Sequence, residues 1–376
     1  MTANDRLHVV IFMPSFGDGG VERMLVNMAG GLAARGLAID FWVGTAGGPF
    51  LERLPPEVRL LRCPSRRAAV RFLAFVRYLR ESRPQVVLTA KDRALRTALR
   101  ARRWSAVPCC VVARPGTTVS ERLAKRSALK RWRTLWLLRG SYRRADLIVA
   151  NSAGVARDVA SITGVPEGRI PVVRNPVITA DLEQLAAAPA THPWIAPGAP
   201  PLILGVGGLR RQKDFDTLLR AFALVQSRRD CRLLVLGSGR LEADLRQLAR
   251  DLGIEERVDL PGFVENPYPF LRAAAVFALS SRWEGSPNVL TEALALGTPV
   301  VSTDCPSGPR EILDGGRLGP LVPVGDAEAL AAAILRTLES PPDRQALREA
   351  VREYTVAENA RRYEALLRAL PRIGTA

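Results

Sequence analysis

Two glutamates, Glu284 and Glu292, are the residues whose spacing points most directly to chemistry. The apolar run Ala273–Leu279 before them predicts a buried parallel strand. Ser286 and Pro287 predict a helix start, so Glu284 lies on a loop and Glu292 inside the helix. The two carboxylates therefore cannot form a close acid–base pair. They suit hydroxyl groups on two parts of one ligand, with an anion between those parts at the helix start.

A second candidate is the loop 205–213, Gly-Val-Gly-Gly-Leu-Arg-Arg-Gln-Lys, which lies between an expected strand and an expected helix. Its backbone amides and the cations of Arg210, Arg211 and Lys213 can bind phosphate. A nucleotide-sugar would fit this order. Its sugar would meet one carboxylate, its diphosphate the anion site, and its ribose the second carboxylate. The alternatives are a capped helix with surface glutamates and a structural turn followed by exposed cations.

The segment 280–301 and the following Cys-Pro-Ser-Gly-Pro-Arg-Glu at 305–311 resemble the Glu-x7-Glu region of the family-four retaining glycosyltransferases. In that family the first Glu binds the donor sugar and the second binds the ribose. The resemblance implies the GT-B fold, in which two doubly wound Rossmann-like domains face each other across a cleft. It also implies transfer with retention, no metal ion, and no cofactor besides the nucleotide-sugar substrate.

The same resemblance implies roles for individual residues. Lys213 matches the lysine of the family's diphosphate clamp, but Gly208 stands where the family has an arginine, so Arg210 or Arg211 is expected to take its place. The predicted catalytic residues are Glu284, Lys213, Arg210 and Arg211. The residues predicted to bind the nucleotide-sugar are Gly20, Gly208, Lys213, Gly237, Phe263, Val264, Glu284, Gly285, Ser286, Asn288, Val289 and Glu292.

Two residues of the N-terminal half, Glu22 and Arg114, are predicted to bind the acceptor. Glu22 follows Gly19-Gly20, which resembles the family's glycine-rich loop, although a helix start that needs glycine only for its turn is the alternative. Arg114 takes the place of a Glu-Arg-Asn loop found in several relatives with lipid acceptors. Many relatives carry a histidine near the reacting sugar, and neither His8 nor His192 lies in a suitable loop.

Strand and helix patterns alternate along the chain, which predicts an α/β protein with two doubly wound sheets. We expect an acceptor-binding domain at 1–180, a linker rich in Ala and Pro at 181–200, and a nucleotide-sugar-binding domain at 201–355. By the resemblance, residues 356–376 form a helix that packs back on the N-terminal domain. A helix at 119–143 and a strand at 170–173 are among the expected elements.

Composition limits the class of protein. The chain has 376 residues, a net charge of +17, five scattered cysteines and two histidines. Its length suits two domains, the cysteine spacing predicts reduced thiols in the cytoplasm, and the two histidines make a histidine-based zinc site improbable. No apolar stretch reaches the roughly 18 residues that a spanning helix needs. Cations crowd residues 62–144, so one half of the molecule is expected to face something anionic.

The expected helix at 119–143 combines apolar and basic side chains at helical spacings. Such a composition is typical of a helix that lies in a membrane interface. We therefore expect peripheral binding to the anionic inner face of the cell membrane, where a lipid-linked acceptor can be reached. A domain helix with a solvated basic edge is the alternative. The apolar members are Leu123, Leu129, Trp132, Leu135 and Trp136.

The predicted function is transfer of a hexose or N-acetylhexosamine from a UDP-sugar to a glycan acceptor, with a polyprenyl-diphosphate-linked glycan as the expected acceptor. This resembles members that act in bacterial surface-polysaccharide or lipid-linked oligosaccharide assembly. A sugar-nucleotide epimerase of the same architecture is the first alternative, and it would usually need histidines. A nucleic-acid-binding protein is the second, but no recognised motif accompanies the basic charge.

Overall fold

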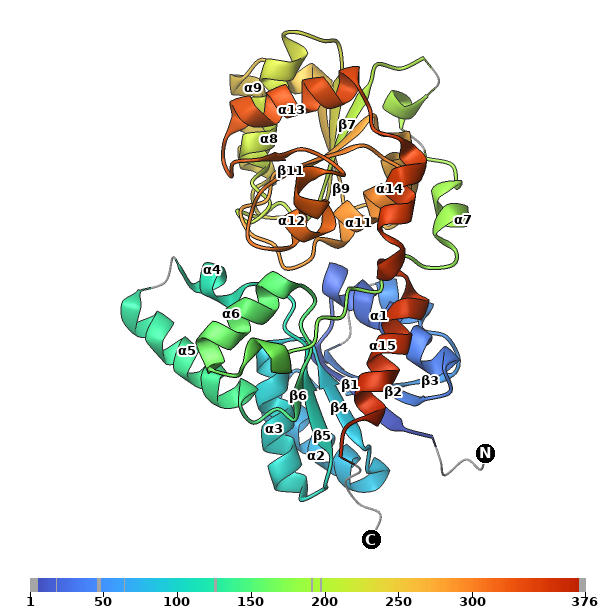
Figure 1. Ribbon diagram of the computed structural model, residues 1–376, viewed down its shortest axis with the longest axis vertical. Helices are drawn as coiled ribbons and strands as arrows, with labels where there is room; N and C mark the ends of the chain where they lie inside the picture. Colours follow the sequence, from blue (N-terminus) through green and yellow to red (C-terminus); the bar gives the residue numbers. More distant parts are fainter. Residues whose placement is uncertain are drawn as a thin grey trace. The chain divides into compact units, whose positions relative to one another are not determined.

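The computed structural model describes residues 6–17, 19–45, 49–63, 65–124, 127–190, 192–196 and 198–371 (Figure 1). The chain divides into two compact units. Unit 1 comprises Met1–Val177 and Thr355–Ala376, and unit 2 comprises Ile178–Tyr354. Each unit is built on a six-stranded sheet whose strand pairs are parallel, so the predicted α/β architecture with two doubly wound sheets is confirmed.

Unit 1 contains the sheet with strand order β3-β2-β1-β4-β5-β6. Alternate residues of its central strand point to opposite faces. Val9 and Ile11 belong to one hydrophobic core, and Val10 and Phe12 belong to the other. The strands are β1 (His8–Ser15), β2 (Ala38–Thr45), β3 (Val58–Arg62), β4 (Val86–Thr89), β5 (Cys110–Ala113) and β6 (Leu147–Ile148).

Helices cover both faces of this sheet. On one face α1 (Gly20–Ala34) packs against α15 (Val356–Arg368), so closely that a Cβ at Gly31 would lie 2.7 Å from Val356 Cγ1. The other face carries α2 (Ala68–Ser82), α3 (Asp92–Ser105), α4 (Val119–Ala124), α5 (Ala128–Tyr142) and α6 (Ala153–Thr163). The described residues of the unit also include two short 3-10 helices, η2 (Pro49–Arg53) and η3 (Glu167–Arg169).

Unit 2 repeats the plan with strand order β12-β11-β10-β7-β8-β9. The strands are β7 (Leu202–Val206), β8 (Arg232–Leu236), β9 (Val258–Gly262), β10 (Val276–Leu279), β11 (Val300–Thr303) and β12 (Leu321–Val322). One face carries α8 (Phe215–Gln226), α9 (Glu242–Asp251) and α13 (Ala327–Glu339). The other carries α7 (Leu182–Ala186), α10 (Tyr268–Ala273), α11 (Asn288–Ala295), α12 (Gly308–Ile312) and α14 (Arg344–Ala350). Its 3-10 helices are η4 (Pro193–Ile195), η5 (Glu255–Arg257), η6 (Asp314–Gly316) and η7 (Arg352–Tyr354).

Three expected elements differ in the structure. The helix expected at 119–143 is two helices, α4 and α5, with residues 125 and 126 between them outside the described residues. The strand expected at 170–173 is a single bridge between Ala150 and Val172, because Pro171 has no N–H to give to a ladder. The segment expected as a linker contains α7, whose Leu182 and Ala186 are buried in a core of unit 2.

The strand order of each sheet reverses direction at one point. In unit 1 the reversal lies between β1 and β4, and in unit 2 it lies between β7 and β10. In open parallel sheets, ligands bind at the carboxyl ends of the strands at this point, because the connecting loops there separate and leave room. The fold alone therefore directs attention to the loops after these four strands.

Asp40 on β2 is a buried carboxylate at the centre of a polar cluster in unit 1. It accepts hydrogen bonds from His8 Nε2 at 2.9 Å, Arg59 Nε at 2.8 Å and the Tyr78 hydroxyl at 2.6 Å. Burial acts to raise the pKa of Asp40, but the hydrogen bonds from these three side chains outweigh it and hold the pKa well below its usual range. The charged form of Asp40 therefore stabilises unit 1.

Replacing this carboxylate should weaken unit 1 alone. Asp40→Asn should lower the free energy of opening of β1 and β2 by about 2 kcal/mol, because hydrogen bonds to a buried charge are lost. Hydrogen exchange followed by mass spectrometry should show this loss, with β7 and β8 unaffected. Asp230→Asn is the matched control, since Asp230 also contacts two arginines, Arg232 and Arg257, but at the surface.

The effect of Asp40→Asn should depend on pH in a defined direction. Because the pKa is lower in the folded state, the stabilisation is complete above the unfolded pKa of about 4 and is lost as pH falls through the folded value. The difference in urea stability between wild type and Asp40→Asn should therefore shrink below about pH 4. A difference that grows as pH falls would contradict the assignment.

Candidate functional site

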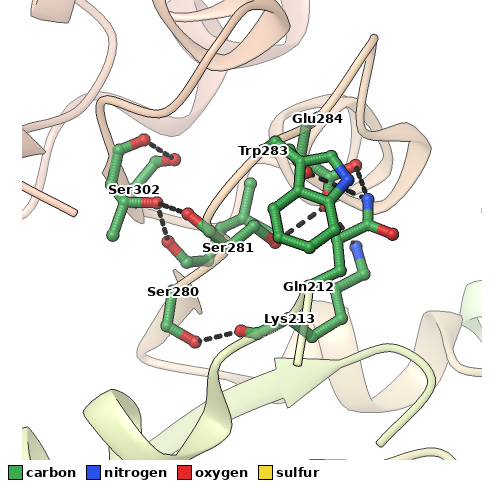
Figure 2. Close-up of polar contacts among 9 residues, drawn as sticks. Gln212, Lys213, Ser280, Ser281, Trp283, Glu284 and Ser302 are labelled. Carbon is green, nitrogen blue, oxygen red and sulfur yellow. Dashed lines mark hydrogen bonds and ion pairs between the residues drawn. The ribbon is translucent and has the colours of Figure 1, made fainter. Parts of the chain in front are cut away.

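A lysine–glutamate ion pair occupies the point where the strand order of unit 2 reverses. Lys213 lies on the loop between β7 and α8, and Glu284 lies on the loop between β10 and α11. Lys213 Nζ is 2.7 Å from Glu284 Oε1, and Glu284 is only 6% exposed (Figure 2). The structure therefore brings together two residues that are 71 positions apart in the sequence and that the motifs had singled out separately.

Neighbouring polar side chains orient this carboxylate. Ser281 Oγ donates to Glu284 Oε1 at 2.7 Å. Gln212 Nε2 donates to the Trp283 carbonyl at 2.9 Å and lies 3.5 Å from Glu284 Oε2 (Figure 2). Ser281 and Gln212 were missed by the sequence analysis. The one feature of the sequence that could have indicated them is their position next to predicted site residues. Gln212 precedes Lys213, and Ser281 lies three positions before Glu284.

Two glycines let the surrounding loops come close together. Gly237, after β8, has φ of +147°, and a Cβ there would lie 2.0 Å from the Gly207 carbonyl oxygen. A Cβ at Gly308, after β11, would lie 2.3 Å from the Gly285 carbonyl oxygen. Any side chain at these positions would push the backbones apart. The loops after β7 and β8 are thus in contact, and so are the loops after β10 and β11.

The loop after β11 also binds the backbone of Glu284. Glu284 N donates to the Pro306 carbonyl at 2.6 Å, and Ser307 N donates to the Glu284 carbonyl at 2.8 Å. In this loop, burial and then the charge of Glu284 raise the pKa of the Cys305 thiol to about 12. Cys305 is therefore a neutral thiol at physiological pH and a poor nucleophile. Its place in the motif reflects packing beside Glu284.

Arg210 lies over Gly208, the position where the family has an arginine. The three atoms nearest to a Cβ built on Gly208 all belong to Arg210, and its Nε is 3.3 Å away. Arg210 and Arg211 are both exposed. Arg210 is thus the side chain nearest to that position, and its role as the cation that replaces the arginine remains a prediction.

The remaining donor residues fall into two groups. Glu292 and Val289 are buried in α11, which begins at Asn288 with Pro287 as its cap, one residue later than expected. The helix ends before Gly297, as expected. By contrast, 263–264 follow β9, the edge strand, which β7 and β8 separate from β10. Most predicted donor residues thus lie in unit 2, on the loops after β7, β8 and β10 and on α11, with Phe263 and Val264 at the sheet edge. Gly20 lies apart from them, at the start of α1 in unit 1.

Unit 1 carries a second ion pair at its own point of strand reversal. Lys91 Nζ is 2.6 Å from Glu22 Oε1. Glu22 is buried in the first turn of α1, two residues after Gly20, and Lys91 occupies the N-cap position of α3, two residues after the end of β4. Lys91 was missed by the sequence analysis. A cation between a buried strand and the start of a helix was the available signal, the same pattern that marked the loop after β7.

Arg114 lies inside unit 1 and is only 3% exposed. Its Nη2 donates to Asn175 Oδ1, and its backbone N–H donates to the Thr89 carbonyl at 2.8 Å. Loss of hydration lowers the pKa of Arg114, and Tyr363 of α15 opposes this shift. These contacts tie β5 to α15 and to the segment that leaves unit 1. The acceptor role of Arg114 remains a prediction.

Comparison with known proteins identifies the family. Residues 200–340 match the model for glycosyl transferases group 1, and residues 18–181 match the model for glycosyltransferase family 4. The chain belongs to the family-four glycosyltransferases. This family-four chain also resembles the solved structure of Anabaena Alr3699/HepE in complex with UDP-glucose, with a TM-score of 0.78 at 18% identity over 96% of this chain and 100% of that one. That likeness confirms the predicted GT-B fold.

Two curated relatives are bacterial glycosyltransferases. One, from Campylobacter jejuni, is named N-acetylgalactosamine-N,N'-diacetylbacillosaminyl-diphospho-undecaprenol 4-alpha-N-acetylgalactosaminyltransferase, and it is 33% identical over 54% of each chain. The other is the lipopolysaccharide core biosynthesis glycosyltransferase LpsE of Rhizobium meliloti, 34% identical over 58% of this chain and 62% of LpsE. The matches therefore span between half and two thirds of the length of these relatives.

Proposed function

We propose that the protein transfers a hexose or N-acetylhexosamine, with retention and without a metal ion, from a UDP-sugar to a glycan linked to polyprenyl diphosphate. Such an acceptor lies in a membrane, so the reaction would take place at the inner face of the cell membrane. The observation that carries the proposal is the Lys213–Glu284 pair at the strand reversal of unit 2. A cation for the diphosphate and a carboxylate for the sugar hydroxyls lie there within 2.7 Å of each other.

The charges of the reaction explain why this pair suits it. Breaking the bond between the sugar and phosphate places positive charge on the sugar and negative charge on the departing diphosphate. Lys213, Arg210 and the backbone amides of their loop would stabilise the departing diphosphate. The acceptor hydroxyl would form the new bond to the anomeric carbon on the face that the phosphate leaves. Its proton would pass to the departing phosphate oxygen.

The contacts of Glu284 suggest how diphosphate and sugar binding are coupled. Glu284 Oε1 accepts from both Lys213 and Ser281, while Gln212 lies near Oε2. A diphosphate that draws the ammonium of Lys213 toward itself frees one acceptor position on Oε1. A hydroxyl of the donor sugar can then donate to that position. The sugar would thus be held firmly only when its diphosphate is present.

The relatives support the substrate classes. The name of the Campylobacter jejuni relative contains a diphospho-undecaprenol acceptor, and the solved Anabaena structure contains UDP-glucose. The Glu22–Lys91 pair offers matching chemistry in unit 1, a carboxylate for glycan hydroxyls and an ammonium for a phosphate. We therefore extend the proposal by assigning the acceptor to this pair.

Replacing the two glutamates of the motif should impair different steps, turnover for Glu284 and nucleotide binding for Glu292. Glu284→Gln should lower kcat about tenfold or more with little change in UDP affinity, because its contacts are to the sugar. Glu292→Gln should weaken UDP binding about tenfold, because the ribose loses a charged acceptor. Transfer of labelled sugar from a panel of UDP-sugars and calorimetry with UDP measure the two quantities. Glu339→Gln, at an exposed site on α13, is the control.

The same assays separate the proposal from its main rival. Unchanged UDP affinity in both Glu292→Gln and Lys213→Ala would refute the donor assignment. Conversion of one UDP-sugar to its isomer, with no acceptor present, would instead identify a sugar-nucleotide epimerase.

The position of Arg210 predicts an asymmetry between two adjacent arginines. Arg210→Ala should lower the transfer rate about tenfold or more, because a charge-assisted contact to the leaving group is lost. Arg211→Ala is the matched control and should have little effect. Adding Gly208→Arg to Arg210→Ala should restore part of the rate, since the new side chain then finds the space that Arg210 occupied. Equal losses for both arginines would contradict this assignment.

Variants of the Glu22–Lys91 pair should weaken binding of the acceptor and leave binding of the donor unchanged. The double variant Glu22→Gln/Lys91→Met removes both charges, so no buried carboxylate is left without its partner. Its KM for the lipid-linked acceptor should rise about tenfold, and its UDP affinity should match that of wild type. Glu57→Gln, at an exposed site, is the control. An unchanged acceptor KM would remove Glu22 and Lys91 from the proposed acceptor site.

A further inference from the structure

The exposed large hydrophobic side chains of unit 1 have an unusual distribution. Throughout the described part of this unit, all of them lie on α2, α3 and α5. Isolated apolar side chains at a protein surface need no explanation, but a group confined to one helical layer does. The group consists of Val70, Leu73, Trp104, Leu129, Trp132, Trp136 and Leu137.

Helix α5 has two apolar faces. Leu138 and Tyr142 are buried on the face toward the sheet. The opposite face exposes Leu129 (68%), Trp132 (63%) and Trp136 (64%), whose spacings of three and four residues place them in one stripe. A helix at the surface of a unit needs one apolar face to pack. The second face therefore contributes nothing to the packing of unit 1.

The three helices form one layer on the same face of the sheet (Figure 1). Helix α3 packs against both α2 and α5. On α2, Val70 and Leu73 are exposed at a spacing of three residues, and the ring of Trp104 on α3 lies edge-on to Phe72 of α2 with centroids 5.5 Å apart. The outward side of this layer thus carries apolar residues on each of its helices. We call it the α2–α3–α5 face.

This face is also strongly basic. The three helices contain twelve Arg or Lys residues but only two acidic residues, Glu81 and Asp92, and α5 has no acidic residue. Arg133 is exposed and borders the stripe, one helical turn from both Leu129 and Trp136. Exposed cations on α3 and α5 include Arg100, Arg103, Lys130, Arg133 and Arg139.

We propose that the α2–α3–α5 face docks on the anionic surface of a lipid bilayer. Its Trp and Leu side chains would enter the interface, and its Arg and Lys side chains would bind lipid phosphates. The inference deepens the proposed function and rests on it for one point, because a polyprenyl-linked acceptor must be reached at a membrane. In the described part of the chain, no helix combines the length and apolar character needed to cross a bilayer.

The mixture of side chains favours lipid over a protein partner. The buried centre of a protein interface is depleted of charge, whereas the exposed Arg133 borders the stripe of tryptophans one turn from Trp136. At a bilayer surface the arginine stem can lie along apolar groups while its guanidinium stays at the phosphates. Tryptophan has the same preference for the boundary between headgroups and acyl chains.

Vesicle binding by the full chain tests the proposal. The protein should co-sediment with vesicles of phosphatidylcholine and phosphatidylglycerol at low salt, and should be released at high salt or when phosphatidylglycerol is omitted. Removing a cation that contacts the leaflet should weaken partitioning about fivefold. The charge variant is Arg100→Glu/Arg103→Glu/Arg133→Glu, and the apolar variant is Trp132→Ser/Trp136→Ser. Both should bind at least tenfold more weakly than wild type.

Helix α8 of unit 2 and the residues just after it supply matched controls. Leu224 is an exposed leucine on this helix, and Arg220 and Arg228 are exposed cations four positions to either side of it. Leu224→Ser and Arg220→Glu/Arg228→Glu should bind vesicles like wild type. Quenching of wild-type tryptophan fluorescence by brominated acyl chains gives a readout that needs no variant.

Two results would overturn the membrane assignment. One is wild-type protein that stays in solution with anionic vesicles at low salt. The other is loss of binding in the charge variant with full binding in the tryptophan variant and no quenching, which would indicate a general polyanion site such as one for nucleic acid. Vesicle binding with no transfer of sugar would leave the docking face standing and reject the proposed function. Transfer to the lipid-linked acceptor in detergent without vesicle binding would reject the docking face and leave the proposed function standing.

Discussion

The reversal of strand order in each sheet is the constraint on which the rest of the structure depends. It places the segments that follow the first and fourth strands side by side, and in both units a lysine from one segment pairs with a glutamate from the other. The pairs are Lys213–Glu284 at 2.7 Å and Glu22–Lys91 at 2.6 Å. The two units differ in which strand precedes the lysine. The lysine follows the first strand in unit 2 and the fourth strand in unit 1. Burying a carboxylate is costly unless it is paired, so each pair makes a buried glutamate tolerable where a ligand can reach the lysine.

Rigidity around Glu284 follows from backbone contacts. The loops come within a distance that only glycine permits at Gly237 and Gly308, and the loop after β11 forms two hydrogen bonds with the backbone of Glu284. Ser281 and Gln212 then orient the carboxylate. A group held in this way loses little freedom when it binds a ligand, which is what transition-state stabilisation requires.

The sequence predicted the fold well, because buried strands appear as apolar runs that end in glycine or cap residues. It failed where a short pattern was ambiguous, as at 170–173, where Pro171 prevents a ladder. For the site, Glu284 and Lys213 were found through motifs. Ser281, Gln212 and Lys91 were not, because their residue types are common. The importance of Gln212 and Lys91 also comes from contacts with residues far away in the sequence. Such contacts depend on strand order, which one-dimensional patterns do not contain.

On the helices of the α2–α3–α5 face, the residues that pack against the sheet are separate from those that are exposed. One helix can therefore both pack in the unit and present an apolar surface. The inward residues Ala94, Ala98 and Ala101 of α3 are small and fully buried, so this helix can lie close to the strands. On α5, Leu138 and Tyr142 make the contacts to the core. The exposed tryptophans, Trp132 and Trp136, make no comparable contribution to this core, so replacing them should leave the unit folded. The cost of exposing them to water in the free protein is then offset only when another apolar medium covers them.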